Sequence, residues 1–163
     1  MVSSKFYPSP LLAELLVSLR RYGKRIVFTN GCFDLLHPGH IHVLTQAKAL
    51  GDILVVGINS DTSVKRLKGD RRPILKENER LLMLAALETV DYITVFDEDT
   101  PLALIQLLQP QILAKGGDWS PEAIVGKDVV ETGGGKVVMI PYQSGFSTTG
   151  IIERILVAYR GNI

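Results

Sequence analysis

The sequence has little of several features that would place it in other classes of protein. Its 163 residues include one cysteine, Cys32, which excludes an internal disulfide framework and is typical of a reducing compartment. No apolar run approaches the ~20 residues of a membrane span, and the N-terminus lacks the apolar region of a signal peptide. The net charge of +1 argues against a broad surface for nucleic acid or membranes. We therefore expect a cytoplasmic protein that binds neither.

Strand-like and helix-like patterns alternate along the chain, with no repeat or long linker between them. We expect one domain over residues 1–163, with an N-terminal helix in 1–23 and a catalytic core in 24–163. The nearly all-apolar run Ile53–Ile58 is typical of a parallel strand buried on both faces. The other expected strands are Arg25–Thr29, Tyr92–Phe96, Ile112–Lys115 and Lys136–Ile140, and the expected helices are Leu11–Tyr22, Pro38–Leu50, Glu77–Leu87, Pro101–Leu108 and Ile151–Tyr159.

This alternation predicts an α/β fold, a Rossmann-like, doubly wound, five-stranded parallel sheet with helices on both faces. Ligands of such sheets bind beyond the carboxyl ends of the strands, near the point where the strand order reverses. Three loops that follow expected strands could converge there: the one after Thr29, Lys115–Trp119, and Ser147–Thr149.

The most informative of these loops is Asn30–His40 (NGCFDLLHPGH), which runs from a strand into a helix. A helix N-terminus presents unpaired backbone N–H groups and partial positive charge, which favour phosphate. His37 and His40 stand three residues apart in the first turn, where both imidazoles can donate to one anion. Neither a G-x-G-x-x-G pattern nor a Walker A loop occurs here. The loop therefore predicts a phosphate site equipped for chemistry.

A zinc site is the alternative interpretation of the histidines. Zinc needs three or four ligands, and the nearby candidates besides His37 and His40 are His42 and Cys32. Cys32 lies in the preceding loop, and His42 should point to another face of the helix, where we expect a surface role. We therefore expect no metal ligand from the protein.

The pattern Gly-x-Phe-Asp-x-Leu-His-x-Gly-His over residues 31–40 resembles the signature of the nucleotidyltransferase superfamily that includes the cytidylyltransferases and phosphopantetheine adenylyltransferase. The likeness covers nearly the whole chain from Arg25 on. Within that superfamily the sequence looks most like the adenylyltransferases of ADP-heptose synthesis. The further segments that carry this likeness are Asn59–Asp61, Lys65–Asp70, Arg72–Pro73, Asp97–Pro101, Lys115–Asp118 and Ser147–Thr149.

The resemblance implies transfer of AMP from ATP to D-glycero-β-D-manno-heptose 1-phosphate, which yields ADP-heptose and pyrophosphate for the lipopolysaccharide core. The chemistry is consistent with this, because a phosphate monoester with a second pKa near ~6 is already a nucleophile at neutral pH. Direct in-line attack then needs alignment and positive charge, without a protein base or a covalent intermediate. We expect Mg²⁺ to enter with ATP and bridge its phosphate oxygens. The resemblance also implies a homodimer and a separate heptose kinase that supplies the substrate.

The same resemblance implies the site residues. The expected catalytic residues are His37, His40 and Lys65, the last as a mobile clamp on the phosphates. The expected nucleotide contacts are Cys32, Phe33, His37, His40, Gly116, Gly117, Asp118, Ser147, Thr148 and Thr149, and the expected sugar-phosphate contacts are Asp34, Lys65, Lys68, Arg80, Lys115 and Trp119.

Several of these residues also have a purely structural interpretation. Lys65 and Lys68 can belong to a solvated charged face, and Asp34 can brace its loop by accepting backbone N–H bonds. Arg80 can be an ion-pair partner, and Ser147 is at minimum a helix N-cap. For the activity, one alternative is a cytidylyltransferase that uses CTP with glycerol 3-phosphate or a similar small alcohol phosphate. An alternative of another class is a non-catalytic nucleotide-binding regulatory module.

Overall fold

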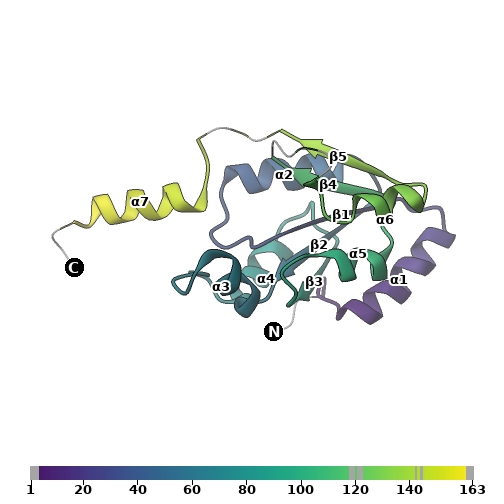
Figure 1. Cartoon of the computed structure of the whole chain (residues 1–163), viewed down its shortest axis with the longest axis horizontal. Coiled ribbons are helices and arrows are strands. Elements are labelled where there is room, and N and C mark those ends of the chain that lie inside the picture. The colour runs from purple at the N-terminus through teal and green to yellow at the C-terminus, as the bar shows by residue number, and fades with distance from the viewer. Residues whose placement is uncertain (1–3, 118–119, 121–122, 142, 144, 161–163) are drawn as a thin grey trace.

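Five parallel strands form one sheet in the order β3-β2-β1-β4-β5, which confirms the predicted doubly wound fold (Figure 1). The computed structural model describes residues 4–117, 120, 123–141, 143 and 145–160. The order reverses between β1 and β4, so the carboxyl ends of these two strands flank the switch point. The strands are β1 (Ile26–Gly31), β2 (Ile53–Asn59), β3 (Tyr92–Phe96), β4 (Ile112–Gly116) and β5 (Lys136–Ile140).

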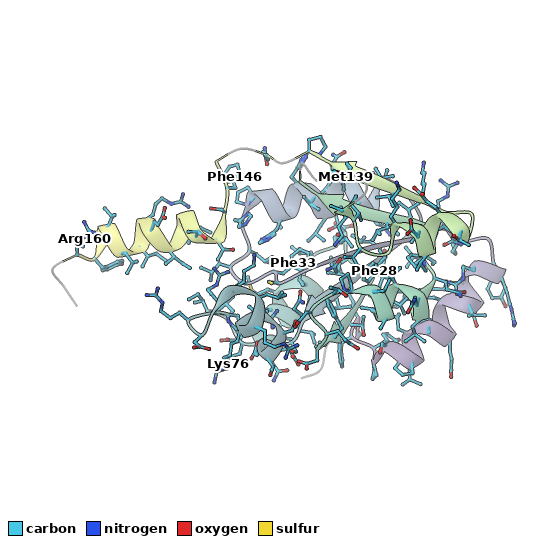
Figure 2. The ribbon with its side chains drawn as sticks, in the orientation of Figure 1. Phe28, Phe33, Lys76, Met139, Phe146 and Arg160 are labelled. Carbon is cyan, nitrogen blue, oxygen red and sulfur yellow. The ribbon has the colours of Figure 1, made fainter. Side chains whose placement is uncertain are left out.

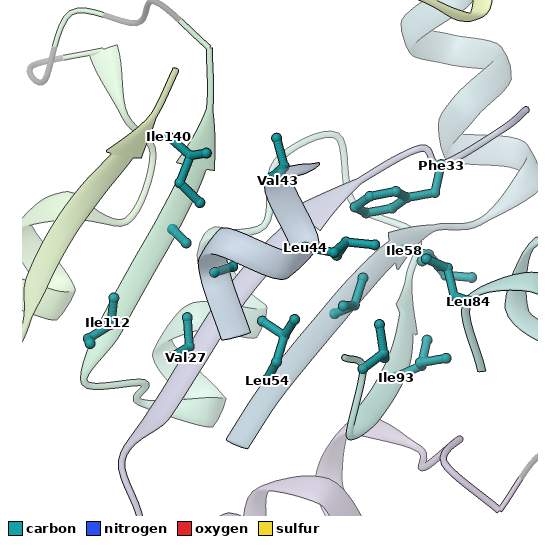
Figure 3. Close-up of a cluster of buried hydrophobic side chains, with 14 of the residues drawn as sticks. Val27, Phe33, Val43, Leu44, Leu54, Ile58, Leu84, Ile93, Ile112 and Ile140 are labelled. Atoms are coloured by element: carbon teal, nitrogen blue, oxygen red, sulfur yellow. The ribbon is translucent and has the colours of Figure 1, made fainter. Parts of the chain in front are cut away.

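Helices cover both faces of the sheet because successive strand residues point to opposite sides. Val27 packs in a cluster with Leu44 of α2 and Leu84 of α4, whereas Phe28 packs with Leu12 of α1 and Ile105 of α5 (Figure 3 shows the first cluster). The helices are α1 (Ser9–Arg21), α2 (Pro38–Lys48), α3 (Asp61–Lys68), α4 (Glu77–Ala85), α5 (Leu102–Leu108), α6 (Lys127–Thr132) and α7 (Thr148–Ala158).

Two short helices, α3 and α6, have no counterpart among the helices expected from the sequence, which offered a solvated charged face as the structural interpretation of Lys65 and Lys68. In α3 the Ser60 hydroxyl caps the first turn by accepting the backbone N–H of Ser63 at 3.0 Å. Arg66 then pairs with Asp99 at 2.7 Å across the loop that follows β3. The helix has few apolar residues and buries only Ser63 and Val64, so its composition does not mark it as a helix that packs on the core. A tertiary ion pair, invisible to sequence periodicity, helps hold it in place.

The last helix, α7, projects away from the body of the molecule (Figure 1). None of its residues is buried, although its composition is strongly apolar. No helix within the described ranges is long and apolar enough to cross a membrane.

Candidate active site

A pocket of about 870 Å³ opens beyond the carboxyl ends of β1, β2 and β4, where the first turns of α2 and α7 face it. The strand ends contribute backbone and short polar side chains, and the two helices contribute their N-terminal turns. Its walls contain Thr29, Asn30, Gly31, Cys32, Phe33, Asp34, His37, Gly39, His40, Val43, Asn59, Leu67, Lys68, Arg72, Gly116, Gln143, Gly145, Phe146, Ser147, Thr148 and Thr149. The loops after the first and last strands thus converge as expected.

The two histidines stack at the start of α2. His37 is the N-cap, and its Nδ1 accepts the backbone N–H of His40 at 3.3 Å. The two rings lie 3.7 Å apart between centroids, with 20° between their planes. Gly39 leaves room for this stack, because a Cβ there would lie 3.1 Å from the His37 ring and 3.4 Å from Cβ of Phe146, closer than such contacts usually are. The stack therefore fixes both rings against the wall of the pocket.

Burial controls the protonation state of this pair. It lowers the pKa of His40 to about 4 and also lowers the pKa of His37, because a charged ring loses hydration there. Both rings are consequently neutral near pH 7, and each carries a single N–H. Since Nδ1 of His37 accepts a backbone N–H, we assign its proton to Nε2. Nδ1 of His40 is buried and has no hydrogen-bond partner among the described residues.

Asp34 is nearly fully buried and is held by a loop from a distant part of the chain. Its carboxylate accepts the Nε–H of Arg72 at 2.6 Å and the backbone N–H groups of Ile74 and Leu75 at 2.9 and 2.8 Å. These are the bracing contacts of the structural interpretation, although Asp34 also lines the pocket. The carboxylate thereby holds Arg72, which was not among the expected site residues, in the pocket wall. The only sequence signal for Arg72 was the segment Arg72–Pro73, which is one of the segments that resemble the adenylyltransferases of ADP-heptose synthesis.

The basic residues expected around the acceptor separate into two groups. Lys68, at the end of α3, lines the pocket, whereas Lys65 is exposed and is not part of the pocket wall. Arg80 is fully buried, and donates to the backbone carbonyl of Cys32 at 2.6 Å and to Asp61 at 2.9 Å. Its guanidinium therefore ties the β1–α2 loop to the start of α3. These contacts are those of an ion-pair residue.

The end of β4 supplies bare backbone to the pocket. A Cβ on Gly116 would lie 2.7 Å from Cγ2 of Val43, so any other residue there would force the Val43 side chain on α2 to move. Lys115 lies behind the wall and donates from Nζ to Oδ1 of Asn30, and burial lowers its pKa to about 8. Gly117 follows with a φ of +123° and is not part of the wall. The expected site residues Asp118 and Trp119 lie outside the described residues.

The opposite wall is the start of α7. The Ser147 hydroxyl accepts the backbone N–H of Gly150 at 3.0 Å, which makes Ser147 the N-cap. Thr148 and Thr149 line the pocket beside Ser147, and Figure 2 shows Phe146 at this end of the helix. Two helices of eleven residues each therefore border one pocket with their N-termini, and both N-termini favour negative charge.

Asn59, at the end of β2, is a further wall residue that the sequence analysis did not select. Its amide donates to the Ser63 hydroxyl at 3.0 Å, and its Oδ1 lies 3.9 Å from Sγ of Cys32. Burial raises the pKa of the Cys32 thiol, which keeps it protonated and unreactive near pH 7. Among the described residues no group of three or more His, Cys, Asp or Glu side chains could hold a metal ion.

A parallel sheet with a donor-lined pocket at its switch point is typical of nucleotide-binding α/β domains, and the comparisons specify the class of this one. The family model described as Cytidylyltransferase-like matches residues 28–154, so the chain belongs to that family and is a nucleotidyltransferase. A relative named Bifunctional protein HldE, from Trichlorobacter lovleyi, is 54% identical over 156 residues. That match covers 96% of this chain and 32% of the relative, so the chain spans about a third of the relative's length.

Two solved structures share the fold. One is described as the lipopolysaccharide core biosynthesis protein from Thermoplasma volcanium, and it matches with a TM-score of 0.61 and 31% identity. The match covers 74% of this chain and 98% of that structure. The other, a pantoate-beta-alanine ligase from Francisella tularensis, has a TM-score of 0.62 at 17% identity, covering 95% of this chain and 77% of that one. The second similarity concerns the fold alone.

Proposed function

We propose that this nucleotidyltransferase transfers AMP from ATP to D-glycero-β-D-manno-heptose 1-phosphate and releases pyrophosphate, giving ADP-heptose for the lipopolysaccharide core. The observation that carries the proposal is the pocket that two helix N-termini share, one of which holds the stacked His37 and His40. A triphosphate stretched between these ends would meet backbone N–H groups and hydroxyls at one end and imidazole N–H groups at the other. Because the reaction consumes ATP, we place it in the cytoplasm.

The residues of the pocket serve alignment and charge rather than proton abstraction. The acceptor phosphate is itself the nucleophile, so the neutral rings of His37 and His40 act as donors to the α-phosphate and not as bases. Ser147–Thr149 would hold the β- and γ-phosphates, while Lys68 and Arg72 lie on the wall where the acceptor phosphate would enter. The attack is in line, and no covalent enzyme intermediate forms.

The pocket suits a metal ion that arrives with the nucleotide. Asp34 is the one carboxylate among the described wall residues, and its oxygens already accept three N–H groups. Mg²⁺ would therefore be held by the triphosphate oxygens, where it neutralises charge on the phosphates. The protein's own contribution is the set of donors around them.

The acceptor is proposed from two likenesses. The segments from Asn59 to Thr149 resemble the adenylyltransferases of ADP-heptose synthesis. The structural match from Thermoplasma volcanium is described as a lipopolysaccharide core biosynthesis protein. We propose that a separate heptose kinase supplies the acceptor substrate.

The test measures pyrophosphate release by the purified chain with ATP or CTP, each paired with heptose 1-phosphate or glycerol 3-phosphate. We expect turnover with ATP and heptose 1-phosphate, and a fall in kcat of at least ~10²-fold in His40→Ala, typical of losing one preorganised donor. Turnover with CTP and glycerol 3-phosphate instead would establish the cytidylyltransferase alternative. Binding of nucleotide without turnover of any pair would favour a regulatory module.

A further inference from the structure

Helix α7 carries an apolar stripe that nothing in the described chain covers. Ile151, Ile155 and Tyr159 recur every four residues, and Ile152 and Leu156 lie beside them on the same face. Ile155, Leu156 and Tyr159 are 48%, 57% and 55% exposed, and no residue of α7 is buried. The helix points away from the sheet, with Phe146 at its near end and Arg160 at its far end (Figure 2). An isolated helix of this length is unstable in water, so a partner is expected.

A second apolar feature lies on the same molecule, between α2 and α4. It is a groove of about 770 Å³ that adjoins the active-site pocket, since His37 and Gln143 line both. Ile41 and Met83 are 40% and 49% exposed in it. None of the described residues that line the groove is Asp, Glu, Lys or Arg. Depletion of charge is what distinguishes the core of a protein–protein interface from ordinary surface.

The groove cannot be filled by the α7 of its own chain while the active site keeps its shape. Ser147, Thr148 and Thr149 form part of the pocket wall, and α7 leaves that wall pointing outward (Figure 1). To enter its own groove the helix would have to reverse direction within the few residues after Gln143. That reversal would withdraw Ser147–Thr149 from the pocket.

We propose that α7 packs into the α2–α4 groove of a second copy of this chain, whose own α7 fills the first copy's groove. Such an exchange is closed by a two-fold axis, because each copy presents the same helix and the same groove. The five side chains of the stripe expose on the order of 400 Å² together, if each has a surface of about 200 Å² and is roughly half exposed. Two helices buried in two grooves then remove roughly 1,600 Å² from water, the standard size of a specific interface.

The exchange would order both active sites. The partner's α7 would cover Pro38 and Ile41, in the first turn of α2 that follows His37. In return, the far end of each α7 would be anchored in the partner while its first turn holds Ser147–Thr149 at its own pocket. This coupling to the site rests on the proposed function, whereas the packing of α7 does not.

The experiment measures the mass of the whole chain in solution by light scattering over a range of concentrations. We expect a dimer for the parent chain. Ile155→Asp on α7 and Met83→Asp in the groove should each weaken dimerisation by at least ~100-fold, as loss of a buried hot-spot contact does. The matched control is Leu107→Asp on α5, which is 45% exposed but outside both surfaces, and it should stay dimeric. Circular dichroism verifies folding, and Ile155→Ser and Met83→Ser replace any variant that fails to fold.

Three outcomes would overturn the proposal. The first is a parent chain that is monomeric at every concentration, which would point to an own-chain or unrelated partner for α7. In the second, Ile155→Asp dissociates the dimer and Met83→Asp does not, so that α7 packs elsewhere. In the third, Leu107→Asp dissociates it as well. Because mass is measured without nucleotide, failure of the pyrophosphate assay would leave this result unaffected.

The coupling is tested separately by kcat/KM. Ile155→Asp and Met83→Asp should lower it at least ~10-fold at concentrations where the parent is dimeric, because the first turns of α2 and α7 lose their support. Leu107→Asp should keep the parent value. Equal kcat/KM in all four proteins would refute the coupling.

Discussion

His40, a half-buried histidine of the pocket, should make the protein lose stability as the pH falls. Burial places the pKa of His40 at about 4 in the folded chain, against 6.5 for an unperturbed side chain. A group with a lowered folded pKa of this kind is protonated first in the unfolded chain, so protons favour unfolding. The stabilising effect of the neutral ring is complete above about pH 6.5, and is lost progressively as the pH falls toward about 4. The full loss is about 3 kcal/mol, of which about 2 kcal/mol falls between about pH 7.5 and about pH 5.

The assay is urea denaturation at those two pH values for the parent chain and for His40→Gln. His37 has a pKa lowered by burial as well, so it adds to the parent's loss in the same direction. We therefore expect the free energy of unfolding of the parent to fall by at least about 2 kcal/mol, and that of His40→Gln to fall by about 2 kcal/mol less than the parent. If His40→Gln keeps the pH dependence of the parent, the ring of His40 is not held neutral by burial.

Two further predictions concern the basic side of the pocket. Asp34→Asn should lower the free energy of unfolding by about 3 kcal/mol, because it leaves the Arg72 guanidinium without its carboxylate partner. A loss below about 1 kcal/mol in urea denaturation would contradict the bracing role of Asp34. Lys68→Ala should raise KM for a phosphate substrate at least about 10-fold, as the loss of a charged hydrogen bond does, while Lys65→Ala stays within about twofold. Steady-state kinetics of the two variants decide between these lysines, and a larger effect of Lys65→Ala would support Lys65 as the phosphate clamp.

The strands were predictable because each is an apolar run with a turn signal on either side. Tyr92–Phe96 and Lys136–Ile140 have the expected bounds, and the other three strands differ from prediction by one or two residues at their ends. Helix α3 was not predicted, since Ser63 and Val64 are its only buried residues and its remaining side chains read as a charged loop. An apolar stripe marks a helix that packs on a core, and α3 has too few apolar residues to form one.

Within the candidate site, the sequence alone determined the local part: a strand, a loop and a helix N-terminus that hold His37 and His40 only a few residues apart. The remaining contacts of the site join residues far apart in the sequence, so sequence analysis did not predict them. Asp34 and Arg72 are thirty-eight residues apart and bond at 2.6 Å, and no local pattern signals that pairing. The same limit applies to Lys65 and Lys68, which the sequence does not distinguish. Only the path of α3 in the folded chain puts Lys68 in the wall of the pocket. The tertiary structure decided which charges meet because contacts between distant segments depend on how the sheet brings its strand ends together.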